Sequence, residues 1–222
     1  MHFRKTFVSL SIIAVSLLLL QAAHGDDLSK VLQELDAAAK DFHTTTTNVE
    51  FDTIQTDPIP DKDVMTGMAY YERNGNRFQM AAHLTQHNNR PAAKTYILSD
   101  GTLRISDAGK ISDAKVYSQA GKYESYLMLG FGASGAQLAE KWTITYKGTE
   151  TIDGVKTDEL ELVAKDPAIR KNIAKVTIWL DTSRAVSLKQ VFDEGEGQSY
   201  ICTYTNIKVN QGVPANAFTF DK

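Results

Sequence analysis

The sequence predicts a mainly β protein of the α+β class, in which one strongly curved antiparallel sheet wraps around a few helices or forms a half-open barrel. Residues at helical spacing occur near the start of the chain, and most later residues fall into short runs with alternating apolar and polar positions. The connections between these runs are too short for parallel crossovers. A long sheet with one apolar face must cover that face, and the few helices available favour curvature of the sheet itself.

The composition is that of a globular protein without a nucleic-acid partner. The chain has 222 residues, 42% of them hydrophobic, and a net charge of -3. The apolar fraction is sufficient for a core and excludes global disorder, while a basic surface for DNA or RNA is not indicated. The single cysteine, Cys202, excludes an internal disulfide framework and a cysteine-rich zinc site. Its place in an alternating run predicts a small core residue.

Residues 1–25 are predicted to be a secretory signal peptide. Basic residues at positions 4 and 5 precede a mostly apolar run that extends to position 20, and small residues follow. Cleavage is expected near Gly25, which leaves residues 26–222 as a single secreted domain. The alternative is an N-terminal membrane anchor, but the apolar run is short against the roughly 20 residues that a spanning helix needs.

The predicted element order begins with one helix and continues with strands. Apolar residues recur at helical spacing from Asp26 to Phe42, and the aspartates at the start favour a helix N-terminus. Threonines at positions 44–47 end this helix, because β-branched residues favour strands. Turn residues such as Asn74-Gly75-Asn76 separate the runs that follow. The first strands are predicted as a run beginning at Val49, then Met65–Arg73, Arg77–Leu84, Ala93–Leu98, Thr102–Ser106 and a strand near Val116-Tyr117.

The stretch Tyr123–Lys141 interrupts the strand pattern. Its apolar residues suggest helical pieces, but glycines at positions 130, 132 and 135 prevent one long rigid helix. Strand patterns then resume, with Asp166–Asn172 as a loop or a short turn of helix. The later strands are predicted at Trp142–Lys147, Asp158–Ala164, Ile173–Leu180, Val186–Asp193 and Gln198–Val209.

The sequence shows no combination of residues that predicts catalysis, a metal site or a cofactor. Residues 130–135 have the letters of a dinucleotide-binding loop, but antiparallel strands follow them, so a hinge between helical pieces is the better interpretation. His83 and His87 are interpreted as solvated loop residues, because no third metal ligand is placed near them. Ser134 lacks the spacing of a nucleophile elbow. We therefore predict that the protein is not an enzyme.

Two acidic groups also have simple interpretations. Glu194 and Glu196 belong to a predicted hairpin turn, where their charges are solvated. Asp57, Asp61 and Asp63 could suggest a calcium site, but two prolines break the loop geometry that such a site requires.

Seven stretches carry a resemblance to a known family: residues 176–181, 188–193, 199–206 and 218–220, and residues 66–73, 77–80 and 97–103. They resemble the LolA-like family of periplasmic lipoprotein carriers. The family's fold is an unclosed antiparallel β-barrel, or half-barrel, with a helical lid over an apolar cavity that holds acyl chains. The resemblance implies a carrier that takes acylated lipoproteins or other lipids from an inner-membrane ABC-type exporter and passes them to an outer-membrane acceptor.

The resemblance also implies where the lid and the cavity lie. The lid is expected within Tyr126–Ala139, where the side chains of Leu127, Leu129 and Phe131 would fill the empty cavity. An arginine at a strand end would hydrogen-bond the closed lid as a latch. Arg73 is the candidate, and Arg77 is the rival, because Asn74 replaces the proline that usually follows the family's arginine. The residues expected to line the acyl cavity are Met65, Tyr71, Phe78, Met80, Val176, Ile178 and Leu180.

Three classes of function remain open from the sequence. The first is a monomeric lipid or lipoprotein carrier. The second is an envelope regulator that senses lipids on the same fold without transporting them, although such sensors usually carry an additional domain for which residues 26–222 leave no room. The third is a secreted enzyme on a β scaffold, which would require a convergent polar site that the sequence does not offer.

Overall fold

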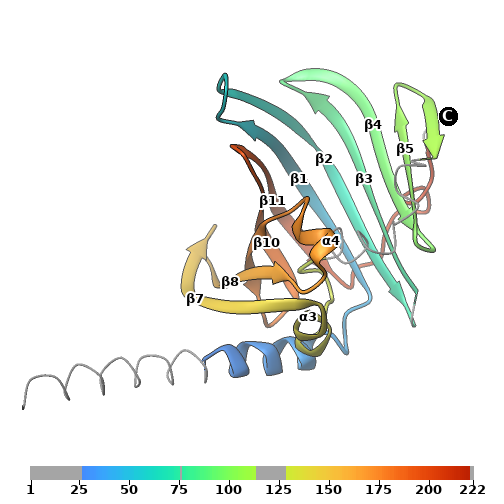
Figure 1. The fold of residues 1–222 in the computed structure, drawn as a ribbon. Helices are drawn as coiled ribbons and strands as arrows, with labels where there is room; N and C mark the ends of the chain where they lie inside the picture. Colours follow the sequence, from blue (N-terminus) through green and yellow to red (C-terminus); the bar gives the residue numbers. More distant parts are fainter. Residues whose placement is uncertain (1–26, 76, 114–128, 221–222) are drawn as a thin grey trace, which may run out of the picture.

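One curved antiparallel sheet dominates the computed structural model, which describes residues 27–75, 77–113 and 129–220 (Figure 1). The 11 strands of the described sheet follow the order β6-β5-β4-β3-β2-β1-β11-β10-β9-β8-β7. All neighbouring strands run antiparallel. The edge strands β6 and β7 are not paired with each other, so the predicted open half-barrel is confirmed.

The observed strands are generally longer than the sequence pattern predicts. The right half of the sheet in Figure 1 contains β1 (Thr44–Gln55), β2 (Asp61–Asn74), β3 (Arg77–His87), β4 (Arg90–Ser99), β5 (Thr102–Asp107) and β6 (Lys110–Asp113). The remaining strands are β7 (Trp142–Ile152), β8 (Val155–Ala164), β9 (Lys175–Asp181), β10 (Val186–Gly195) and β11 (Gln198–Val209). The short helix α4 (Pro167–Arg170) occupies the stretch predicted as a loop or a helical turn. The strand predicted near residues 116 and 117 lies outside the described residues.

The first helix ends earlier than the predicted boundary at Phe42. The chain is helical over residues 27–38 and then turns, while residue 26 lies outside the described residues. The side-chain oxygen of Asn210 accepts hydrogen bonds from the backbone N–H groups of His43 and Thr44, and its amide donates to the carbonyl of Asp41. These bonds stabilise the turn after the helix. Asn210 lies more than 160 residues further along the chain, so the local sequence pattern around the helix could not predict these bonds.

His83 and His87 lie in β3, so their prediction as loop residues is wrong. Asn88 and Asn89 have φ values of 48° and 61°, which allow a two-residue turn between β3 and β4. The strand can therefore continue to His87. The ring nitrogen Nε2 of His83 lies 2.7 Å from the carbonyl oxygen of Ala217, and that of His87 lies 2.5 Å from Oδ1 of Asp63.

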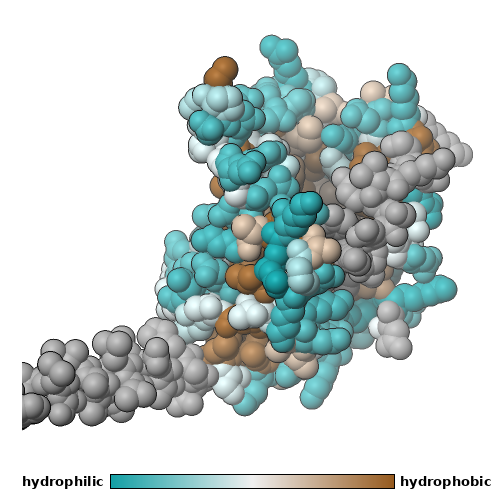
Figure 2. All heavy atoms as spheres, in the orientation of Figure 1, coloured by the Kyte–Doolittle hydropathy of each residue, from teal (hydrophilic) through white to brown (hydrophobic). Residues whose placement is uncertain are grey.

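The concave, inner face of the sheet carries two apolar clusters. The first, the barrel cluster, contains Phe42, Val49, Ala69, Tyr71, Phe78, Met80, Leu84, Leu98, Leu103, Phe131, Val186, Cys202 and Tyr204. The second, the helix cluster, contains Val31, Leu35, Leu129, Leu138, Trp142, Leu160, Leu162, Ala164, Val176, Ile178, Leu180 and Ala185. The N-terminal helix and α3 (Gly135–Lys141) cover the helix cluster. Apolar residues are visible around the N-terminal helix in Figure 2. Among the described helices, none is long and apolar enough to cross a membrane.

Candidate functional site

Residues 129–134, here called the cover segment, lie over the inner face where the two clusters meet. Leu129 belongs to the helix cluster and Phe131 to the barrel cluster. Phe131 forms a β-bridge with Val186, and the backbone N–H of Gly132 donates to the carbonyl of Ala185 at 2.8 Å. The described part of the predicted lid is thus helical only in α3. The predicted lid residue Leu127 lies outside the described residues.

The side chain of Phe131 fills the space between two tyrosines of the sheet. Its ring stacks on Tyr71, with centroids 3.8 Å apart and planes 8° apart, and meets Tyr204 edge to face at 4.8 Å. Phe131 has no exposed surface. Aromatic contacts of this kind contribute about 0.5–1.5 kcal/mol beyond the burial of area. Phe131 therefore occupies the inner face of the half-barrel as a plug.

Arg73, at the end of β2, contacts the cover segment from one side. Its Nη2 donates to the carbonyl oxygen of Gly132 at 2.5 Å, and its Nη1 donates to the carbonyl oxygen of Ala39 at 3.3 Å. No carboxylate among the described residues forms an ion pair with it. Desolvation lowers the pKa of the half-buried guanidinium from its ordinary value, because burial disfavours the charged form. One side chain thus joins β2, the turn after the N-terminal helix and the cover segment.

The rival residue Arg77 lies away from the cover segment. Its side chain is 84% exposed, and its Nε is 3.8 Å from Oδ1 of Asp100, in the turn between β4 and β5. The register of β2 and β3 pairs Arg73 with Phe78 and Tyr71 with Met80, so these four residues share one face. Arg73 therefore lies on the same face of the sheet as Tyr71, whose ring stacks on Phe131.

Gln190, on β10, contacts the cover segment from the other side. Its Nε2 donates to the carbonyl oxygen of Leu129, and its Oε1 accepts from the hydroxyl of Tyr204 at 3.2 Å. The hydroxyls of Tyr204 and Tyr71 are 3.5 Å apart. Gln190 is only 3% exposed. Sequence reasoning missed this residue, because an amide at one inward position of an otherwise ordinary strand gives no motif.

The residues predicted to line one acyl cavity fall into both clusters. Tyr71, Phe78 and Met80 belong to the barrel cluster, and Met65 packs against it. Val176, Ile178 and Leu180 belong to the helix cluster and have no exposed surface. The second group packs against the N-terminal helix and α3, whereas the first group belongs to, or packs against, the cluster that contains Phe131.

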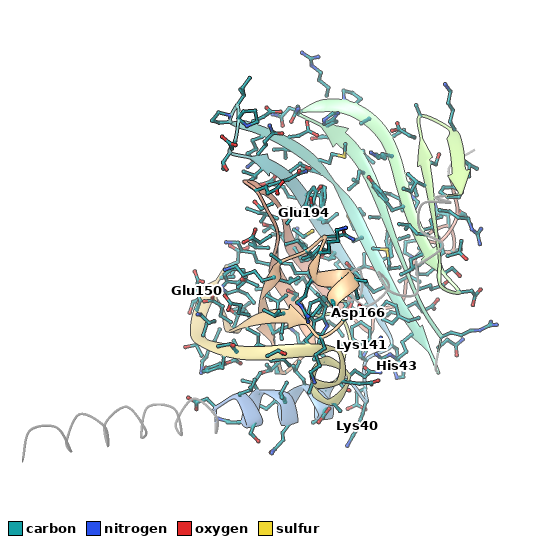
Figure 3. The ribbon with its side chains drawn as sticks, viewed as in Figure 1. Lys40, His43, Lys141, Glu150, Asp166 and Glu194 are labelled. Carbon is teal, nitrogen blue, oxygen red and sulfur yellow. The ribbon has the colours of Figure 1, made fainter. Side chains whose placement is uncertain are left out.

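A surface groove of about 650 Å³ opens beside the cover segment. It lies between the end of the N-terminal helix, the turn after β2 and the start of α3, near the labelled residues Lys40 and His43 in Figure 3. The groove is lined by Asp36, Ala39, Lys40, Phe42, His43, Arg73, Gly75, Ser134, Ala136 and Gln137. Its walls come from three separate parts of the sequence, so no local pattern could have predicted it.

The other polar residues singled out from the sequence have structural contacts. Ser134 is the N-cap of α3, where it forms a capping box with Gln137. The hydrogen bond with His87 lowers the pKa of Asp63 from its ordinary value. Burial raises the pKa of Glu194, which lies at the end of β10. Among the described residues, no group of three or more histidine, cysteine, aspartate or glutamate side chains is arranged to hold a metal ion.

The open sheet with a covered inner face defines the fold class: an unclosed antiparallel half-barrel. No protein-family model matches the sequence, and no curated protein matches it either. The solved structure of MucB is similar, with a TM-score of 0.54 and 14% identity over 88% of this chain and 63% of MucB. The MucA/MucB complex of Pseudomonas aeruginosa gives a TM-score of 0.51 at 14% identity, over 88% of this chain and 61% of the other. This chain therefore spans less than two thirds of MucB.

A LolA superfamily protein from Nitrosomonas europaea is also similar in fold. Its TM-score is 0.39 at 13% identity, and the match covers 86% of this chain and 96% of that protein. All these identities are low, so the similarity concerns the fold alone.

Proposed function

We propose that this protein is a periplasmic carrier that shields the acyl chains of lipoproteins or other lipids on the inner face of its half-barrel. The observation that supports this proposal is the plug: Phe131, with no exposed surface, occupies the barrel cluster from a short segment that is not part of the sheet. Phe51, Met65, Tyr96, Ile105, Phe192, Ile207 and Val209 extend the same apolar surface and are only partly buried. An acyl chain that displaced Phe131 would find an apolar surface beneath it.

The energies of the cover and of a ligand are of similar size. Burying one phenylalanine contributes about 1.5–3 kcal/mol, and each methylene group taken out of water contributes about 0.8 kcal/mol. A charged hydrogen bond such as that from Arg73 to Gly132 adds about 1.5–3 kcal/mol. An acyl chain of ordinary length can therefore displace the cover segment, and the returning cover recovers part of that energy when the chain leaves. Reversible binding of this kind suits a carrier that must also release its cargo.

In this proposal Arg73 is the latch of the closed cover. Its guanidinium bonds the carbonyls of Gly132 and Ala39, so movement of the cover segment would break one of these bonds and leave the other. The proposed route runs from an inner-membrane ABC-type exporter to an outer-membrane acceptor, with the carrier acting as a monomer.

Native mass spectrometry tests the proposal directly. The secreted protein is purified from the periplasm without detergent, and its intact mass is measured before and after addition of acylated lipopeptide or phospholipid. We expect a bound lipid whose mass identifies the cargo class. A clean protein mass that also rejects both added lipids would mean that the inner face is an ordinary packed core, and the carrier function would be wrong.

A regulator that senses lipids without transporting them is the second candidate. Support comes from the similarity to MucB, which has been solved in complex with MucA. A lipid-transfer assay distinguishes a carrier from a sensor. A carrier passes bound lipopeptide to acceptor vesicles or to an acceptor protein, whereas a sensor retains the lipid and changes its affinity for a partner protein.

A further inference from the structure

The structure assigns Gln190 and Tyr204 to a polar subsite that binds the carbonyl oxygen of an ester- or amide-linked acyl chain. This inference rests on the proposed lipid-binding function and names the ligand chemistry of the same face. The two residues form a hydrogen-bonded pair within an apolar surface. The carbonyl oxygen of Leu129 accepts a hydrogen bond from the Gln190 amide of this pair. When a lipid displaces the cover segment, the lipid's own carbonyl would take the place of that oxygen.

The cost of burial explains why such a pair requires a partner. A buried amide or hydroxyl without a hydrogen bond costs about 1–3 kcal/mol, and Gln190 and Tyr204 are 3% and 6% exposed. In the closed state the Leu129 carbonyl satisfies Gln190. A pure hydrocarbon entering the inner face would leave the Gln190 amide unpaired, whereas an acyl ester or amide supplies a carbonyl of the same chemistry.

The cover segment itself resembles such a ligand. It presents a backbone carbonyl at Leu129 and, two residues later, an apolar side chain at Phe131 that stacks on Tyr71. This combination of a carbonyl acceptor followed by an apolar group is the chemistry of an acyl linkage. The hydroxyl of Tyr204 donates to Oε1 of Gln190 at 3.2 Å, which directs the amide N–H groups of Gln190 toward the acceptor.

A further polar atom lies on the same face. Thr45 pairs with Tyr71 across β1 and β2, so both residues face inward. Its Oγ1 is buried, and it has no hydrogen-bond partner among the residues that the structure describes. A buried hydroxyl without a partner requires an explanation, and a polar group of a ligand on this face would supply one.

A competition between two matched probes tests the subsite. Methyl hexadecanoate and hexadecyl methyl ether are offered together in equal amounts, and the ratio retained by the protein after gel filtration is measured by mass spectrometry. The ratio does not depend on how easily the cover opens, because both probes must displace it. We expect Gln190→Met to lower the ester-to-ether ratio about threefold to tenfold relative to the unmodified protein. Tyr204→Phe, which keeps the ring, should lower it by a smaller factor. Gln79→Met, the same substitution on the opposite face of β3, should leave it unchanged.

The outcomes distinguish the subsite from the proposed function. Retention of neither probe by the unmodified protein would overturn lipid binding and the subsite together. Retention of both probes at a ratio that Gln190→Met and Tyr204→Phe leave unchanged would overturn the subsite while the carrier function stands. Thermal unfolding of each variant shows whether it is folded. If Gln190→Met does not fold, Tyr204→Phe provides the test.

Discussion

Arg73 shows how one side chain can connect three separate parts of the fold. Its two terminal nitrogens bond carbonyl groups of the cover segment and of the turn after the N-terminal helix, and its own backbone N–H donates to the carbonyl of His43 at 2.7 Å. The planar guanidinium can reach two carbonyls at once, which a lysine cannot do in the same geometry.

We expect Arg73→Leu to loosen the cover segment without unfolding the sheet. Loss of the charged hydrogen bonds should cost the closed state about 1.5–3 kcal/mol, so amide hydrogen exchange at Gly132, whose N–H bonds Ala185, should become faster. Lipid should enter more readily and be released to an acceptor less completely. The matched control is Arg77→Leu, because Arg77 is exposed and forms its ion pair with Asp100, in the turn between β4 and β5. Equal exchange at Gly132 in both variants would contradict the latch.

Three buried ionisable residues of the barrel cluster predict an alkaline limit of stability. Burial raises the pKa of the Cys202 thiol to about 12 and raises the pKa values of Tyr71 and Tyr204 above their ordinary value of 10.0. The folded state therefore keeps protons that the unfolded chain loses from about pH 9 upward. The stabilisation is complete below the unfolded pKa values and decreases as the pH rises toward the folded ones.

The free energy of unfolding should fall as the pH is raised from about 8 to about 11. Each of the three groups can contribute at most on the order of 1.4 kcal/mol per pH unit above its unfolded pKa. Urea titrations at several pH values measure this slope, and Cys202→Ala should make it shallower. A slope that is the same in Cys202→Ala would mean that the thiol ionises normally. Cys202 should also resist alkylation until the protein is unfolded.

At the scale of elements, the position of α3 depends on a close approach to the N-terminal helix. A Cβ atom added at Gly135 would lie 2.2 Å from the carbonyl oxygen of Leu32. Gly135 is the last glycine of the stretch whose letters match a dinucleotide-binding loop. Its close approach to Leu32 explains why a glycine stands there. Gly132 is a second case: its φ is +67°, and an added Cβ would lie 2.3 Å from the ring of Phe42.

Gly135→Ala separates helix propensity from packing. Alanine favours a helix by up to about 1 kcal/mol over glycine, but the clash with Leu32 should cost about 1–3 kcal/mol, so we expect a net loss of stability in urea unfolding. Ala136→Gly, at an exposed neighbouring position of α3, measures the propensity effect alone. Stabilisation by Gly135→Ala would show that the two helices separate easily.

At the scale of the whole molecule, the two ends of the chain complete the sheet. β1 pairs with β2 and with β11, so the first and last strands lie side by side at the middle of the sheet. The segment after β11 then bonds β3 through Ala217 and His83. On the outer face, Ala81 of β3 and Ile97 of β4 are nearly fully buried and oppose each other in register.

Removal of the residues after Gly212 should destabilise the outer face near β3 and β4. Loss of the hydrogen bond between His83 and the carbonyl oxygen of Ala217 should cost about 0.5–1.5 kcal/mol. Urea unfolding should show a lower midpoint, and hydrogen exchange should increase in β3 and β4 more than in β8 and β9. Ala215→Ser, at an exposed position of the same segment, is the control. An unchanged midpoint after truncation would mean that this segment does not stabilise the sheet.

Alternation and turn residues were sufficient to predict a strongly curved antiparallel sheet and the order of most of its strands. Alternation was sufficient to place Arg73 with Tyr71 along β2, and Phe78 with Met80 along β3, because strand geometry fixes side-chain direction with a period of two. The register between the two strands then puts all four on one face. Turn signals such as Asn74-Gly75-Asn76 likewise marked the break between β2 and β3.

The contacts that join the sheet to the cover segment and to the turn after the first helix could not be predicted from local patterns. The carbonyl of Gly132 bonds Arg73, the carbonyl of Leu129 bonds Gln190, and Asn210 bonds the turn after the first helix. The structure also separated Val176, Ile178 and Leu180 from the residues that face the cover segment. Periodicity describes a strand and its immediate partners, whereas these contacts join residues far apart in the chain. They depend on how strongly the whole sheet curves, which no single segment of the sequence encodes.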